Sequence, residues 1–192
     1  SALDAAKPTA TYAMQMVESV LEADFGKRCF KNCDVVDITF ACVGAVDALQ
    51  NCLDFCRANP GKKAVVIASD YAKYELESSG EYTQGGGAVA LLLSDNPQLL
   101  EIENVYGVAT ESVFDFFKPR RVALKSDLNS STEFMPDKIE IFTDEPVFDG
   151  HYSNQCYQDR IREAYEHYKD QTGIEKPYKD WRYLIFHLPY AF

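Results

Sequence analysis

Apolar positions repeat along the chain with two different periods, which predict where helices and strands form. A helical spacing of three and four residues is found in three segments, residues 4–23, 45–58 and 155–171. Short, mostly apolar runs of the kind found in buried strands occupy residues 34–40, 63–68, 88–93, 99–108 and 181–186. The order strand, helix, strand over residues 34–68 predicts a βαβ unit in a parallel sheet covered by helices.

The stretches between these segments predict loops and a division into three parts. Residues 69–87 are polar and end in three consecutive glycines. Residues 118–147 are rich in charged residues, Ser and Asn, which indicates a surface insertion or flap. We therefore expect a core over residues 1–117, this insertion, and a final part over residues 148–192 that contains a helix and a strand.

Composition and charge narrow the class of protein. The chain has 192 residues, of which 46% are hydrophobic, enough for one ordinary globular core. A net charge of −11 argues against nucleic acid as a partner, because phosphates are normally neutralised by surplus Lys and Arg. No apolar window reaches the length of a membrane span and no signal pattern opens the chain, so we expect no membrane partner. The first residues lack a methionine and the last follow an apolar run, which suggests a piece of a longer protein.

The cysteines and histidines indicate free thiols rather than a metal site. The six cysteines include no CxxC pair, and the three histidines are scattered. The plain interpretation is a set of free thiols in a reducing cytoplasm.

Cys42 lies where the apolar run of residues 34–40 gives way to a helix that begins near Gly44. The unpaired N–H groups and the positive dipole end of a helix favour an anion, so they would lower the pKa of this thiol. The same N–H groups could hold the oxyanion of a thioester under attack, and Gly44 lets the backbone pass close to a substrate. Cysteine is also a common small core residue, so this stretch alone fits either packing or a nucleophile.

His187 ends the run of residues 181–186 and lies shortly before Pro189, so its backbone is expected to be extended. Active sites of α/β sheets collect at the carboxyl ends of the strands, where Cys42 is also expected. A histidine there could bind a substrate carbonyl or exchange a proton with it. A purely structural histidine is the alternative.

The two other histidines have simpler interpretations. His167 is expected on a solvated helix face. His151 follows a turn and precedes a helix, whose first turn could be capped by Asp149 or Ser153.

Two acids, a glycine run and a basic cluster complete the candidates. Asp70 and Asp115 lie in apolar or aromatic surroundings, where each either supports chemistry or caps a turn. The Gly85–Gly87 run either lines an acyl tunnel or is a tight loop, and it lacks the pattern of a phosphate loop. The basic cluster could meet a phosphate or be solvated surface, and consists of Lys118, Arg120 and Arg121.

Five segments, in order along nearly the whole chain, resemble the 3-hydroxy-3-methylglutaryl-CoA synthase family of the thiolase superfamily. They are ACVGAVDALQ around Cys42, ASDYAKYELESSGEYTQGGGAVALLL, VFDFFKP, FDGHYSNQCYQD, and LIFHLPY around His187. The resemblance implies an α/β class with a thiolase-like layered α/β/α fold of two similar βαβαβαββ halves. This chain would supply part of the first half, within residues 1–117, and the segment that leads to His187.

The resemblance implies an acyltransferase that condenses acyl-CoA substrates by a ping-pong mechanism. Cys42 would take an acetyl group from acetyl-CoA, and its methyl carbon, after losing a proton, would attack the C3 ketone of acetoacetyl-CoA. His187 would polarise that ketone, and water would release 3-hydroxy-3-methylglutaryl-CoA for the mevalonate route to isoprenoids. Coenzyme A thioesters are the substrates, no separate cofactor or metal is implied, and the family forms cytoplasmic homodimers.

The resemblance also assigns roles to the other matched residues. Asp70 and Asp115 would support the chemistry together with Cys42 and His187. The residues expected to shape the substrate pocket are Val43, Gly44, Thr83, Gly85, Gly86, Ser153 and Pro189.

The chain departs from the family pattern in four respects. The family's catalytic glutamate directly precedes the segment that matches residues 1–4, and the second half of the fold is missing. We therefore expect these residues alone to be inactive. Val43 stands where the family commonly has an aromatic residue, and the insertion at residues 118–147 is longer than in short members.

Two alternatives stay open. One is the related synthase that installs β-branches on polyketides bound to a carrier protein. The other is a non-catalytic α/β module in which Cys42 only packs. A ketoacyl synthase, which pairs its cysteine with His and Asn, fits the motifs poorly.

Overall fold

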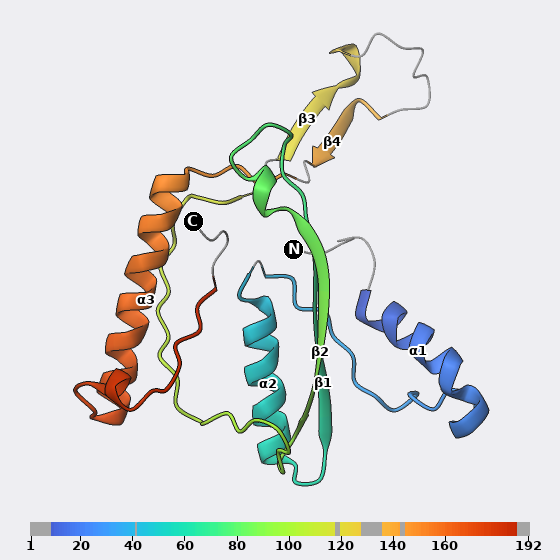
Figure 1. The fold of residues 1–192 in the computed structure, drawn as a ribbon. Coiled ribbons are helices and arrows are strands. Elements are labelled where there is room, and N and C mark those ends of the chain that lie inside the picture. Colours follow the sequence, from blue (N-terminus) through green and yellow to red (C-terminus); the bar gives the residue numbers. More distant parts are fainter. Residues whose placement is uncertain (1–8, 41, 118–119, 128–135, 143–144, 188–192) are drawn as a thin grey trace. The chain divides into compact units, whose positions relative to one another are not determined.

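The computed structural model describes residues 9–40, 42–117, 120–127, 136–142 and 145–187 (Figure 1). The helices and strands in chain order are α1 (Thr9–Phe25), α2 (Gly44–Ala58), β1 (Lys63–Ala72), β2 (Gly85–Ser94), β3 (Arg120–Leu124), β4 (Lys138–Phe142) and α3 (Gly150–Thr172). The chain divides into two compact units. Unit 1 comprises Ser1–Ala72 and Gln84–Glu101, and unit 2 comprises Lys73–Thr83 and Ile102–Phe192.

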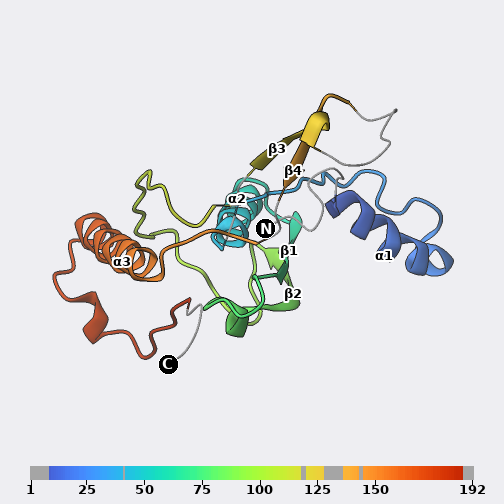
Figure 2. The same ribbon diagram turned by 90° about the horizontal axis from the view of Figure 1, so that it is seen from above.

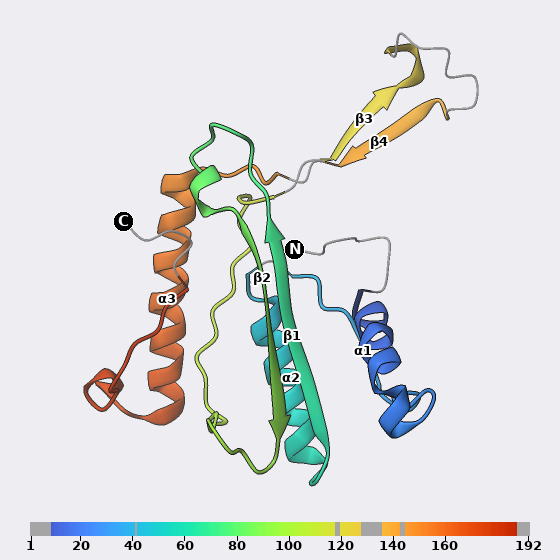
Figure 3. The same cartoon turned by 45° about the vertical axis from the view of Figure 1, so that its right-hand side comes forward.

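In unit 1, helix α2 packs along one face of the two-stranded sheet of β1 and β2 (Figure 3). The buried core consists of Cys56 from α2, Val66 from β1 and Leu93 from β2, which are 1%, 5% and 9% exposed. The thiol of Cys56 also points at the carbonyl oxygen of Leu93, 3.7 Å away. The amphipathic spacing over residues 45–58 therefore predicted both the helix and the face that it buries.

The opposite face of the sheet carries apolar side chains that no described segment covers. Val65 and Ile67 of β1, and Leu92 of β2 opposite Val65, are each more than half exposed. Their neighbours along the strands point toward α2, because successive side chains of a strand alternate between its faces. The sequence predicts a sheet covered by helices, whereas within the described residues a helix covers only one face of this sheet.

The predicted parallel βαβ unit does not form, because residues 34–40 are not a strand. The Asp37 carboxylate instead accepts a hydrogen bond from the Ala10 N–H at 2.9 Å. The Phe40 carbonyl accepts from the Gly44 N–H at 3.0 Å, which turns the chain into α2. A strand needs a neighbour to satisfy its backbone groups, and β1 pairs antiparallel with β2 instead.

In unit 2, helix α3 has clear signals at both ends. The Asp149 carboxylate accepts hydrogen bonds from the N–H groups of His151 and Tyr152, at 3.0 and 3.1 Å. Gly173 ends the helix in the left-handed region, with φ of 68°, and its N–H bonds to the Lys169 carbonyl. The predicted helix and its Asp149 cap are confirmed, although the helix begins at Gly150 rather than at residue 155.

Residues 99–108, predicted as a strand, do not form one, and residues 106–108 lie beside α3 (Figure 2). The Gln171 amide donates to the Tyr106 carbonyl at 2.9 Å. The Val108 N–H donates to Nδ1 of His167 at 3.0 Å. His167 therefore binds backbone, which corrects the expectation that its helix face is only solvated.

Residues 181–186, which were predicted to be a strand, likewise do not form one. The first of them, Trp181, packs on α3. Trp181 lies edge-on to the rings of Tyr165 and Tyr168, with centroid distances of 6.1 and 5.8 Å. Aromatic packing on a helix thus replaces the strand partner that these residues would require. Helix α3 is therefore the element that organises the described part of unit 2.

Residues 118–147, expected to form a surface insertion, contain a hairpin within the described part of the chain. Strands β3 and β4 pair antiparallel, from Arg120 opposite Phe142 to Leu124 opposite Lys138. A further bridge between Phe117 and Val147 closes the base of the hairpin. No helix in the described ranges is long and apolar enough to cross a membrane.

Candidate active site

Cys42 lies immediately before the amino end of α2. Val43 is the N-cap residue and makes no side-chain capping bond, and the helix begins at the buried Gly44. The predicted start of the helix near Gly44 is therefore confirmed. Cys42 is exposed and does not belong to the core of unit 1, so its thiol lies where a substrate can reach it. Its role as the nucleophile stays a prediction.

The glycine run and Asp70 meet in the ladder between β1 and β2. Gly85–Gly87 of β2 lie opposite Ala72, Tyr71 and Asp70 of β1. A Cβ atom at Gly86 would come within 3.1 Å of the Tyr71 ring, which is closer than an ordinary contact. The sequence proposed Asp70 for the chemistry and the glycines for the substrate pocket, and the ladder brings Asp70 and the glycines together at one end of the sheet.

Helix α2 directs Cys42 toward that same end of the sheet. The helix and β1 are joined by the short turn at residues 59–62 and run in opposite directions (Figure 1). The carboxyl end of α2 packs at the other end of the ladder, where Cys56 contacts Leu93. The amino end of α2 therefore points toward the end of the ladder that carries Asp70.

Asp115 and Ser153 are brought together at the start of α3. One Asp115 carboxylate oxygen accepts a hydrogen bond from the Asp149 N–H at 3.0 Å. The other oxygen accepts a close hydrogen bond from the Ser153 hydroxyl group. Asp115 thus fastens the chain before β3 to the first turn of α3, and both of its oxygens bind partners within unit 2.

Tyr157 lies in the segment FDGHYSNQCYQD that resembles the family, but it was not among the candidate site residues. Its phenolic O–H donates to the main-chain carbonyl of His187, with 2.5 Å between the oxygen atoms. Tyr157 follows Ser153 by four residues, which places both on one face of α3. Its place in this matched segment, four residues after Ser153, is the signal in the sequence that points to it.

The remaining candidates are placed as follows. Thr83 donates its hydroxyl to the Gly80 carbonyl at 2.7 Å, within a single 3-10 turn. Pro189 and Lys118 lie outside the described residues. Arg120 and Arg121 belong to β3, and their side chains are not among the described ones.

The candidates fall into two groups, one in each unit. Unit 1 contains Cys42, Val43, Gly44, Asp70, Gly85 and Gly86. Unit 2 contains Thr83, Asp115, Ser153 and His187.

The cysteines of α2 differ in environment from Cys42. Burial raises the pKa of the Cys52 thiol above its usual value, and the neighbouring Cys56 raises it further. Cys52 also packs against the core of unit 1. Cys52 is therefore held as a neutral thiol and is a suitable internal reference for Cys42.

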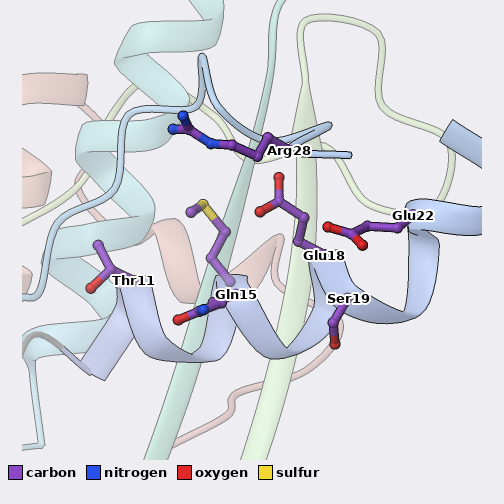
Figure 4. A pocket seen from close by; sticks show the side chains of 7 residues that line it. Thr11, Gln15, Glu18, Ser19, Glu22 and Arg28 are labelled. Atoms are coloured by element: carbon purple, nitrogen blue, oxygen red, sulfur yellow. The ribbon is translucent and has the colours of Figure 1, made fainter. Parts of the chain in front are cut away.

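A surface pocket in unit 1 is lined by none of these candidates. Figure 4 shows Glu18 and Glu22 projecting from α1, with Arg28 on the chain that follows. The full lining is Thr11, Met14, Gln15, Glu18, Ser19, Glu22 and Arg28. Glu18 serves structure here, because its carboxylate accepts a hydrogen bond from the Phe30 N–H at 2.6 Å. Among the residues that the structure describes, no group of three or more His, Cys, Asp or Glu could hold a metal ion.

Comparison with known proteins gives one family. Residues 3–98, half of the 192 residues, match the family model for the N-terminal part of hydroxymethylglutaryl-coenzyme A synthase. The hydroxymethylglutaryl-CoA synthase of Haloferax volcanii is 33% identical over 192 residues, which cover 99% of this chain and 37% of that protein. The chain thus spans little more than a third of the length of this relative.

Solved structures agree with the sequence matches. MvaS in complex with 3-hydroxy-3-methylglutaryl coenzyme A is 30% identical, with a TM-score of 0.62 over 97% of this chain and 37% of that chain. The curacin-pathway HMG synthase in complex with acetyl donor-ACP is 26% identical, with a TM-score of 0.64 over 88% of this chain and 35% of that chain. The predicted fold class is therefore confirmed: the chain is α/β and matches part of a thiolase-like fold.

Proposed function

This chain belongs to the hydroxymethylglutaryl-coenzyme A synthase family, and on that premise we propose that it carries the nucleophile of such a synthase. The complete protein condenses acetyl-CoA with acetoacetyl-CoA and water to give 3-hydroxy-3-methylglutaryl-CoA and CoA. The observation that carries the proposal is the exposed Cys42 thiol directly before the amino end of α2. The amino end of a helix favours negative charge, which suits the position of a nucleophilic cysteine.

The first half-reaction forms an acetyl thioester. The Cys42 thiolate attacks the carbonyl carbon of acetyl-CoA, and the C–S bond to coenzyme A breaks as CoA leaves and takes up a proton. Backbone N–H groups at the amino end of α2 stabilise the negative charge on the carbonyl oxygen in the transition state. The product is acetyl-S-Cys42 and free CoA.

The second half-reaction forms the new carbon–carbon bond. A general base removes a proton from the acetyl methyl group, and the resulting carbon attacks the C3 ketone of acetoacetyl-CoA. His187 polarises that ketone and protonates the alkoxide that forms. Water then hydrolyses the thioester to Cys42, which releases the product and regenerates the thiol.

Asp70 and Asp115 support these steps from different places. Asp70 lies beside the glycine run in the β1–β2 ladder, which together with Val43 and Gly44 forms the wall of the acyl pocket. Asp115 acts through Ser153 and the amino end of α3. We further propose that the enzyme is a cytoplasmic homodimer that feeds the mevalonate route, as expected for its family.

Turnover of the complete protein tests the proposal. With acetyl-CoA and acetoacetyl-CoA, release of CoA is expected to be abolished in Cys42→Ala and retained in Cys52→Ser. Equal loss in both variants would show that the cysteines of this region serve folding, and would contradict the assignment of Cys42. The 192-residue chain alone is expected to show no turnover, because it spans little more than a third of its relatives.

A second candidate acceptor is an acetoacetyl group bound to a carrier protein. The similar curacin-pathway synthase was solved in complex with an acetyl donor-ACP, so a similar protein binds a carrier protein, which supports testing carrier-bound thioesters. Supplying the complete protein with free acetoacetyl-CoA or with the carrier-bound form separates the two. Faster condensation with the free thioester supports the coenzyme A enzyme, and faster condensation with the carrier-bound form supports the polyketide enzyme.

A further inference from the structure

The segment that ends at His187 is fixed at two points, both on α3. Trp181 packs against the rings of Tyr165 and Tyr168 near the carboxyl end of the helix. His187 is fixed through its own carbonyl, which accepts the hydrogen bond from Tyr157. The residues between these points are exposed and have no strand partner among the described residues. The position of the His187 backbone therefore depends on the Tyr157 contact.

Tyr157 is itself held on a fixed part of the helix. Ser153, one turn earlier on the same face, bonds to Asp115, and Asp149 caps the helix just before it. The hydrogen bond from Tyr157 thus starts one turn after the part of α3 that Asp115 and Asp149 anchor. The half-buried side chain of Tyr157 emerges from that turn.

From this arrangement we infer that Tyr157 is a positioning residue for His187. Its hydroxyl group affects the rate of the second half-reaction and not that of the first. This inference rests on the proposed function, in which His187 acts on the ketone of acetoacetyl-CoA. The His187 imidazole must lie within hydrogen-bonding distance of the ketone oxygen. The position of the His187 backbone determines where the imidazole lies. Acetyl transfer to Cys42 needs no group from this segment. Loss of the Tyr157 hydroxyl group is therefore expected to slow the second half-reaction and to leave the first unchanged.

The inference is tested with Tyr157→Phe in the complete protein, which removes one oxygen atom and keeps the ring. Acetylation of Cys42 by acetyl-CoA is measured first. Condensation with acetoacetyl-CoA is then measured and divided by the amount of acetylated Cys42. Because the rate is expressed per acetylated Cys42, it does not depend on how much of the variant protein is folded. Tyr165→Phe is the matched control, since it makes the same change on the same helix and leaves the ring that packs on Trp181.

Tyr157→Phe is expected to leave acetylation within about two-fold of the wild type. Its condensation rate per acetylated Cys42 is expected to fall by about ten- to a hundred-fold, the usual effect of misplacing a catalytic group. Tyr165→Phe is expected to change neither half-reaction. The inference is overturned if Tyr157→Phe matches Tyr165→Phe, or if it slows both half-reactions equally. Absence of acetylation in the wild-type protein would instead contradict the proposed function.

Discussion

The Asp115 carboxylate accepts a hydrogen bond from the Ser153 hydroxyl group, and this contact joins the chain before β3 to the first turn of α3. The same carboxylate also accepts from the Asp149 N–H. Two donors therefore converge on one charged acceptor at the amino end of a helix, where negative charge is favoured.

Removing Asp115 should therefore destabilise unit 2 more than removing Ser153. Asp115→Ala leaves two donors without their acceptor and is expected to cost about 2–3 kcal/mol of unfolding free energy. Ser153→Ala removes one hydroxyl group together with its hydrogen bond and is expected to cost about 1 kcal/mol. Urea unfolding of the complete protein, monitored with a spectroscopic probe in unit 2, measures both losses of unfolding free energy. A larger loss in Ser153→Ala than in Asp115→Ala would show that the carboxylate is not the centre of this contact.

Gly107 lies against the backbone of Ala164 in α3, which leaves no room for a side chain. A Cβ atom at position 107 would overlap the Ala164 carbonyl group. Because backbone atoms within a helix cannot easily move aside, Gly107→Ala is expected to cost about 1–3 kcal/mol of unfolding free energy. Thermal or urea unfolding of the variant measures this loss.

The matched control is Gly150→Ala, at the first residue of the same helix. A Cβ atom there would meet no neighbour within 4 Å. Stability is expected to be unchanged or to rise by up to about 1 kcal/mol, because Ala favours helix more than Gly does. Equal stability of the two variants would mean that the segment near residue 107 does not pack on α3 as described.

The pKa of Cys52 gives a prediction about thiol reactivity and pH. Burial, and then the neighbouring Cys56, raise this pKa above the usual value, so the neutral thiol persists to higher pH in the folded protein. Alkylation by iodoacetamide at pH 8 is therefore expected to be slower at Cys52 than at the exposed Cys33. Mass spectrometry of the alkylated peptides, between pH 7 and 10, measures both rates.

The sign of the linked stability change follows from the same shift. Because the folded-state pKa of Cys52 is raised, the unfolded chain loses this proton first as the pH rises. The stabilising contribution is therefore complete below the unfolded pKa of about 8.5 and is lost as the pH rises through the folded value. Faster alkylation of Cys52 than of Cys33 at every pH would contradict the burial of α2 on the sheet.

The helices could be predicted because their signals are local. The spacing over residues 45–58 specifies α2 and the face with Cys56, and Asp149 supplies the cap of α3. The two long strands were also found, since residues 63–68 and 88–93 lie within β1 and β2. Their antiparallel pairing was not, because an apolar run does not specify its neighbour.

The three predicted strands that do not form fail for one physical reason. A strand depends on a partner elsewhere in the chain, which hydrophobic periodicity cannot identify. Residues 106–108 and 181–187 are held by side chains of α3 instead, through Gln171 and Tyr157 among others. A polar helix face was interpreted as solvated, whereas part of it binds backbone.

The candidate site shows the same division between local and distant information. The placement of Cys42 just before a helix follows from adjacent residues and could be predicted. The contact of Asp115 with Ser153, 38 residues apart, could not be derived from spacing. The role of Tyr157 depends on a contact 30 residues away, so it became visible only in the structure.

The most direct test of the central claim is to map the acetyl group itself. The complete protein is incubated with isotopically labelled acetyl-CoA, trapped at low pH, digested and analysed by mass spectrometry. The labelled acetyl thioester is expected on the peptide that contains Cys42, and it should be lost in Cys42→Ala and Cys42→Ser but kept in Cys52→Ser. Wild-type protein that remains unlabelled, or that carries the label on another residue, would contradict the account.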